Sequence, residues 1–187
     1  MLNNKELIAS QLNHYLSLAT IIGGGALILL VCYISFAINF REDRREPVLL
    51  KAISEYILPI GFFATLGGTF MSLFYSDYLF YTPCSLCWYQ RIFMYPLVFI
   101  FLINLLYPDD KVFKYCFPLV IVGLFISIYH NLLILKIIPE TLSPCISGVP
   151  CSVDYLNYFG FITIPLLSFI AFLTIFILLI AHKRRVS

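Results

Sequence analysis

The chain has 187 residues, of which 61% are hydrophobic and only 12% charged, and its mean hydropathy is +0.93. A globular domain carries about 25% charged residues, so this composition excludes a soluble fold and predicts an integral membrane protein. The formal net charge is only +2, and no basic stripe is interleaved with aromatic residues, so we expect no nucleic-acid partner.

Five apolar segments are long enough to cross a bilayer as helices, since about 20 residues span the hydrocarbon core. In chain order they are Leu16–Phe40, Ile53–Tyr75, Trp88–Tyr107, Tyr115–Leu135 and Phe159–Ala181. The first contains three consecutive glycines and no proline, whereas each later segment contains one proline. We therefore expect an all-α integral membrane protein, a four-helix transmembrane bundle with one additional N-terminal transmembrane helix. Residues 1–52 would form the tail, the extra helix and a basic loop, and residues 53–187 the bundle.

The basic residues predict how these five spans are oriented. Nine Lys and Arg residues lie in segments 41–52 and 108–114 and in the C-terminal tail, whereas the opposite face holds only Lys5 and Lys136. Positive charge close to the ends of spans is retained on the cytoplasmic side. We therefore expect the N-terminus outside, the C-terminus inside, and segments 76–87 and 136–158 outside.

Four of the six cysteines fall in these two external segments, as the pairs Cys84/Cys87 and Cys145/Cys151. Disulfides persist in oxidising compartments, so the pairs indicate disulfide chemistry. A structural role is the simpler interpretation, but C-x-x-C closes a very short loop, and the stabilisation from a disulfide grows with loop length. We therefore interpret it as redox-active. The other two, Cys32 and Cys116, lie within spans and are expected to pack as small hydrophobic side chains.

The C-x-x-C pair stands at the start of a predicted helix, where backbone N–H groups and the helix dipole stabilise a thiolate. Arg91 follows Cys87 by four residues and so shares its helical face. An arginine inside a membrane span is costly and is a functional candidate by default. Either Arg91 extends to the outer headgroups, or its charge stabilises a thiolate or a bound electron acceptor.

An electron acceptor is required, because a disulfide exchanger with two cysteine pairs must pass two electrons on in order to turn over. The sequence has no dinucleotide fingerprint, no C-x-x-C-H haem attachment and no iron–sulfur spacing. By elimination we expect a lipid-soluble quinone, which a helix bundle reaches within the bilayer.

Two sequence stretches carry a family resemblance. The string PCSLCWYQRIFMYPL (Pro83–Leu97), followed by PCISGVPCSVDYLNYFGFITIPLLSF (Pro144–Phe169), resembles the DsbB/BdbC family of bacterial disulfide-bond formation proteins. The resemblance implies a bundle in the bacterial cytoplasmic (inner) membrane that oxidises a DsbA-like thioredoxin-fold protein. The electrons pass to ubiquinone or menaquinone, which sustains disulfide formation in extracytoplasmic proteins.

The same resemblance implies roles for individual residues. Cys87 would lie next to the quinone ring with Arg91 assisting, and His130 resembles a family histidine near the quinone. Cys84 would be the exchange partner of Cys87.

In the second pair, Cys145 would take the mixed disulfide with the partner and Cys151 would pass electrons to Cys84. This transfer requires the two external segments to approach within disulfide geometry, with Cα atoms less than about 7 Å apart.

Three alternatives remain at this point. A vitamin K epoxide reductase type of enzyme also combines a four-helix bundle, C-x-x-C and quinone, but its motif usually lies near the last core span. Four thiolates also suit a tetrahedral zinc centre, although the oxidising compartment and Arg91 argue against a metal, and we expect none. The third alternative is a structural membrane protein with two inert disulfides.

Overall fold

The computed structural model describes residues 48–109, 111–142, 144–145, 150–151 and 163–186, and six isolated positions before residue 26. The chain divides into two compact units, Met1–Tyr56 and Ile57–Ser187, and the second unit carries the site described below. Apart from isolated positions, the first predicted span, Leu16–Phe40, lies outside the described residues, as does most of segment 146–162.

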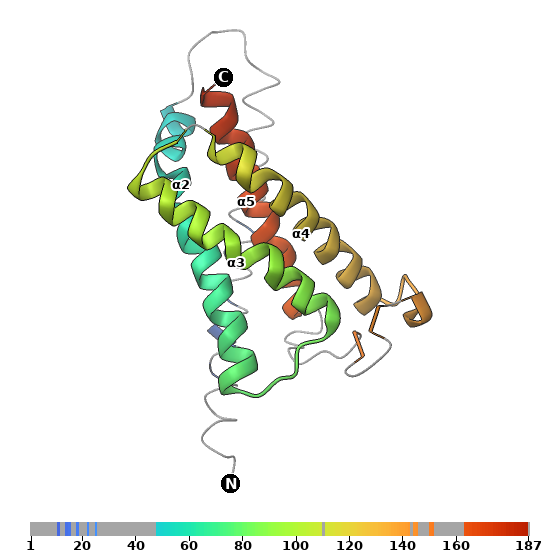
Figure 1. Cartoon of the computed structure of the whole chain (residues 1–187). Coiled ribbons are helices and arrows are strands. Elements are labelled where there is room, and N and C mark those ends of the chain that lie inside the picture. The colour runs from blue at the N-terminus through green and yellow to red at the C-terminus, as the bar shows by residue number, and fades with distance from the viewer. Residues whose placement is uncertain are drawn as a thin grey trace. The chain divides into compact units, whose positions relative to one another are not determined.

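Within the described residues every regular element is a helix, and Figure 1 shows them in chain order. The long helices are α2 (Val48–Leu73), α3 (Ser85–Leu106), α4 (Val112–Ile134) and α5 (Ile164–Val186). A π-helical turn, η1 (Phe74–Tyr78), continues α2, and a 3-10 turn, η2 (Glu140–Leu142), follows α4. Three helical stretches are long and apolar enough to cross a membrane: Leu58–Tyr78, Ser85–Leu106 and Val112–Ile134. The fold is therefore all-helical and membrane-type in the described part of the chain.

The core of the second unit lies between α3, α4 and α5, with α4 packed against both of the other helices (Figure 1). Its fully buried members recur at three- and four-residue intervals, which places them on one face of each helix. They are Met94, Leu97 and Phe101 on α3, Val112, Cys116 and Val120 on α4, and Phe172, Ile175 and Leu179 on α5. Cys116 thus packs as a small hydrophobic side chain, as predicted.

Polar groups inside these helices are mostly satisfied within their own helix. The hydroxyls of Thr65, Ser127 and Thr174 each donate to a backbone carbonyl three or four residues earlier, at 2.7 to 2.9 Å. In lipid an unsatisfied polar group is expensive, so such internal bonds are the expected solution. Polar side chains that instead reach a neighbouring helix therefore indicate a specific role.

Helices α4 and α5 approach closely at Gly123, because a Cβ atom there would collide with the ring of Phe172. Phe172 is fully buried in the core and cannot swing aside without displacing its neighbours.

We therefore expect Gly123→Ala to destabilise the protein by about 1 to 3 kcal/mol through overpacking. The matched control is Gly67→Ala, where an added Cβ would meet nothing within 4 Å. Thermal unfolding in detergent measures both, and equal midpoints for the two variants would contradict this packing.

Candidate active site

Helix α3 begins with Cys84 as its N-cap residue. The backbone of Cys84 is extended, with φ −70° and ψ 170°, and its sulfur accepts the backbone N–H of Cys87 at 3.4 Å. The preceding Pro83 has no N–H to satisfy and restricts the chain before it to an extended form. The helix therefore starts at Ser85, three residues before the predicted Trp88, and the sulfur of Cys84 lies at its N-terminus.

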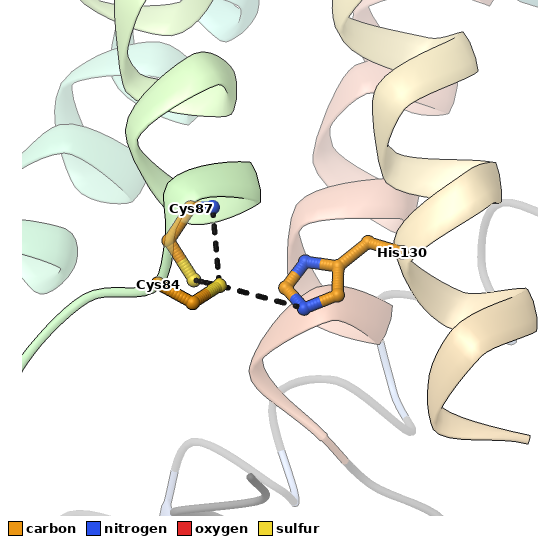
Figure 2. Close-up of side chains that lie close together, drawn as sticks. All are labelled: Cys84, Cys87 and His130. Carbon is orange, nitrogen blue, oxygen red and sulfur yellow. Dashed lines mark hydrogen bonds between the residues drawn. The ribbon is translucent and has the colours of Figure 1, made fainter. Parts of the chain in front are cut away.

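Figure 2 shows three side chains that meet at this helix start. The sulfurs of Cys84 and Cys87 lie 3.0 Å apart, and both cysteines are free thiols. His130 extends from α4 and places its Nε2 atom 3.8 Å from the Cys84 sulfur. Both Cys84 and His130 are buried, with 7% and 2% of their surface exposed.

These contacts favour the thiolate form of Cys84. Its pKa is lowered to about 4, first by the hydrogen bond from the Cys87 thiol. Burial opposes this change, whereas the interaction with His130 and the backbone N–H of Cys87 add to it. Because the thiolate is the form that attacks disulfides, Cys84 is prepared for exchange at neutral pH.

The second cysteine pair lies directly beside the first. Cys145 and Cys151 are joined by a disulfide, with their Cα atoms 5.7 Å apart. The sulfurs of Cys84, Cys145 and Cys151 all lie within 4.8 Å of one another. In addition, His130 Nε2 lies 3.2 Å from the backbone oxygen of Cys151. The fold thus brings together in one cluster two cysteine pairs that are far apart in sequence.

Two polar residues that the sequence analysis did not assign to the site lie beside the first turns of α3. Gln90 is buried, and its Nε2 atom lies 3.2 Å from His130 Nδ1 on α4. On the α2 side, Ser72 accepts two hydrogen bonds from Arg91, at its hydroxyl (2.7 Å) and at its backbone carbonyl (2.9 Å). The sequence signal was present, since both are polar residues in an apolar segment, but their partners depend on tertiary packing.

Arg91 is held in place and does not extend freely into solvent. Besides its two bonds to Ser72, its guanidinium lies 5.2 Å from the ring centroid of Trp88, a cation–π distance. Trp88 is 54% exposed on the outer side of α3. A fixed cation therefore stands one helical turn from Cys87, beside an aromatic ring that faces away from the core.

Comparison with known proteins identifies relatives of this chain. The family model described as "Disulfide bond formation protein DsbB" matches residues 54–182. Disulfide bond formation protein C of Bacillus subtilis (strain 168) is 49% identical over 118 residues, which cover 62% of this chain and 84% of that protein. Probable disulfide formation protein C 2 of Bacillus cereus (strain ATCC 10987 / NRS 248) is 42% identical over 137 residues, which cover 73% of this chain and 97% of that protein. No solved structure matches the chain.

The low pKa of Cys84 leads to a prediction about its reactivity. Alkylation of Cys84 in the reduced protein should be nearly independent of pH from neutrality down to about pH 5 and should fall only around pH 4. An ordinary thiol loses reactivity below about pH 8.5. Replacing His130 by Leu removes its hydrogen bond to the sulfur and should move the midpoint upward.

Mass spectrometry of the Cys84 peptide after short pulses of a neutral alkylating agent measures this profile. Denatured protein supplies the reference with an ordinary thiol. A midpoint near pH 8 in the folded wild-type protein would show that Cys84 is not a stabilised thiolate.

Proposed function

Because this chain belongs to the DsbB family of disulfide bond formation proteins, we propose that it is a quinone-dependent disulfide oxidoreductase. It reoxidises a DsbA-like thioredoxin-fold thiol oxidase and passes the electrons to membrane quinone, which sustains disulfide formation in extracytoplasmic proteins. The observation that carries the proposal is the sulfur of Cys84 within 4.8 Å of both sulfurs of the other pair. Such proximity is what thiol–disulfide exchange between the two pairs requires.

The proposed topology has five spans in the bacterial cytoplasmic membrane, with the N-terminus outside and the C-terminus inside. Residues 1–52 supply the additional helix and residues 53–187 the bundle. Three membrane-capable helices and the distribution of nine basic residues support this arrangement. Both cysteine pairs then lie on the oxidising side.

Electrons enter through the second pair. A partner thiolate attacks the sulfur of Cys145, and the sulfur of Cys151 leaves as a thiolate; the partner's second thiolate then attacks the mixed disulfide and releases Cys145. Exposure supports this order, because Cys145 is half-buried whereas Cys151 is 1% exposed. The partner leaves oxidised, and this chain holds the two electrons on Cys145 and Cys151.

Transfer to the first pair follows by the same chemistry. The Cys151 thiolate attacks Cys84 in the Cys84–Cys87 disulfide, and Cys87 leaves as a thiolate. Cys145 then attacks Cys151, which releases Cys84 and restores the disulfide of the second pair. The bonded Cys145–Cys151 pair beside two free thiols corresponds to the state after this step.

The residues around Arg91 suit a quinone. Helices α2 and α3 run antiparallel, because Ser72 bonds to Arg91 near one end of the pair and Gly61 faces the ring of Phe101 further along, where an added Cβ would collide. One turn deeper than the Ser72–Arg91 pair, Thr69 Oγ1 on α2 and Tyr95 Oη on α3 are buried and have no hydrogen-bond partner among the described residues. Unpartnered buried hydroxyls are uncommon, and together with Arg91 they would hold a quinone by donating hydrogen bonds to its carbonyl oxygens.

When bound, a quinone accepts two electrons and two protons from the dithiol and becomes a quinol. This chain contributes the Cys87 thiol one helical turn from the Arg91 cation, which Ser72 and Trp88 hold in place. The guanidinium favours negative charge close to Cys87. The oxidised Cys84–Cys87 pair is then ready for the next exchange.

One rival function also uses the clustered thiols. Three sulfurs within 4.8 Å would suit a zinc ion, but Cys145 and Cys151 are bonded to each other and so are not thiolate ligands. Stoichiometric zinc in the purified protein would support that rival and contradict the redox function. The vitamin K epoxide reductase alternative is disfavoured because C-x-x-C opens the second helix of the region matched to the DsbB family.

The proposed function predicts the behaviour of two cysteine variants. Cys87→Ser should reduce quinone at the rate seen without protein, because no dithiol forms beside the acceptor. Cys116→Ser, the control in the apolar core, should keep most of the activity. Quinone absorbance, followed after mixing each variant with a reduced thioredoxin-fold oxidase, measures both, and quinone reduction by Cys87→Ser at the wild-type rate would reject the scheme.

The quinone contacts can be tested by a binding measurement, without turnover. Trp88 is the sole tryptophan of the chain, and a quinone bound beside it should quench its fluorescence. We expect the double variant Thr69→Val, Tyr95→Phe to weaken quinone binding by about tenfold, the effect of roughly one lost hydrogen bond. Tyr89→Phe, at an exposed tyrosine on α3, is the matched control. Unchanged quenching titrations in the double variant would remove these hydroxyls from the quinone site.

A further inference from the structure

The buried amide of Gln90 has no place in the thiol chemistry described so far. Gln90 lies on α3, one turn after Cys87, and is 7% exposed. Its Nε2 atom lies 3.2 Å from Nδ1 of His130 on α4. A buried side-chain amide costs free energy unless it is hydrogen-bonded. The bond to His130 offsets this cost, so the role of Gln90 depends on what His130 does.

The Gln90 contact decides which nitrogen of His130 carries the proton. An amide nitrogen donates and does not accept, so Nδ1 of the neutral imidazole is the acceptor and Nε2 carries the hydrogen. The opposite tautomer would place the Nε2 lone pair against the backbone oxygen of Cys151 at 3.2 Å and against the Cys84 sulfur at 3.8 Å. Both of those atoms are acceptors, so the arrangement requires an N–H at Nε2.

That single N–H faces one atom from each cysteine pair. On α3 its neighbour is the sulfur of Cys84, as Figure 2 shows, and in the loop its neighbour is the backbone oxygen of Cys151. Because Cys151 must attack Cys84 in the proposed exchange, a donor that holds both residues sets their separation. Holding reacting atoms in place is a large contribution to rate.

We propose that Gln90 is a positioning residue for exchange between the two pairs: through His130 it keeps an N–H directed at both Cys84 and Cys151 and so docks the second pair against the first. This inference rests on the proposed function. It also assigns His130 to the exchange step between the pairs, in addition to any contact with quinone.

The shared donor responds to the redox state of Cys84. In the Cys84–Cys87 disulfide the sulfur of Cys84 is a neutral, weak acceptor. The N–H of His130 is then directed mainly to the backbone carbonyl of Cys151, and this bond holds Cys151 in place for its attack on Cys84. After transfer Cys84 is a thiolate, and hydrogen bonds to charged acceptors are about twice as strong. The thiolate then competes for the N–H and weakens the hold on Cys151, which disfavours the reverse reaction.

Three groups face the sulfur of Cys84, and a variant that tests the donor should leave the reacting sulfurs unchanged. The three groups are the Cys87 thiol on α3, His130 on α4, and the Cys145–Cys151 disulfide of the loop. Gln90 does not contact the sulfur, so a variant at Gln90 alters the donor without altering either reacting pair.

The experiment uses the full chain with both pairs oxidised and the quinone removed. It is mixed with a reduced thioredoxin-fold oxidase, quenched with acid at short times and alkylated, and the thiols are counted by mass spectrometry. Gln90→Leu, which keeps the size of the side chain, should slow the appearance of reduced Cys84 and Cys87 by about tenfold, the effect of about one hydrogen bond. Reaction of the partner with Cys145–Cys151 should keep its rate.

Two further variants separate positioning from folding. In Gln90→Glu the new carboxylate accepts a hydrogen bond from an N–H at Nδ1 of a protonated imidazole. Nε2 therefore keeps its hydrogen, and the exchange rate should recover. Asn104→Leu removes another buried polar side chain of α3, at its far end, where it bonds the backbone oxygen of Asp109 at 2.8 Å. It should lower thermal stability without slowing exchange.

Three results would overturn the proposal: wild-type exchange rates in Gln90→Leu, no recovery in Gln90→Glu, or a parallel fall in quinone quenching of Trp88 fluorescence in Gln90→Leu. Failure of the proposed function would look different. In that case the wild-type protein itself would not transfer electrons from the partner to Cys84 and Cys87.

Discussion

The hydrogen-bonded first turns of α3 are the feature on which the rest of the site depends. Cys84 caps the helix, and because successive residues are rotated by about 100°, Gln90 and Arg91 face different neighbours. Gln90 meets His130 on α4, and Arg91 meets Ser72 on α2. One short segment therefore positions the sulfur of Cys84 and connects it, through Gln90 and Arg91, to the helices on either side.

The polar side chains of these helices divide into two groups with different consequences. Those in the core, such as Thr65 and Thr174, bond to their own helix and leave the apolar packing unchanged. Those around α3 bond between helices, which in lipid ties the helices to a defined rotation and depth. The end of the second unit that carries the cysteines is thus ordered by directional bonds, whereas its centre is ordered by packing, for example of Gly123 against Phe172.

Composition predicted the helical membrane fold, and cysteine spacing identified the two pairs that the fold brings together. They did not predict Gln90 or Ser72 as site residues, because the rotation of α3 about its axis is set by packing against α2 and α4. The start of α3 was placed three residues late, since hydropathy marks the apolar run whereas the helix begins at its cap, Cys84. The prediction of an additional first span concerns residues outside those described and stays a prediction.

Burial of the sulfurs limits the proposed exchange to the two pairs, because it keeps their electrons from passing to other disulfides. Cys84 and Cys151 are 7% and 1% exposed, so the atoms that must react with each other are the ones withdrawn from solvent. Cys145, which would meet the partner, is half-buried. A low pKa at an exposed sulfur would make it react with any disulfide that it met. Here the sulfur of Cys84 is enclosed by Cys87, His130 and the second pair, so the disulfide that lies within its reach is that of the second pair.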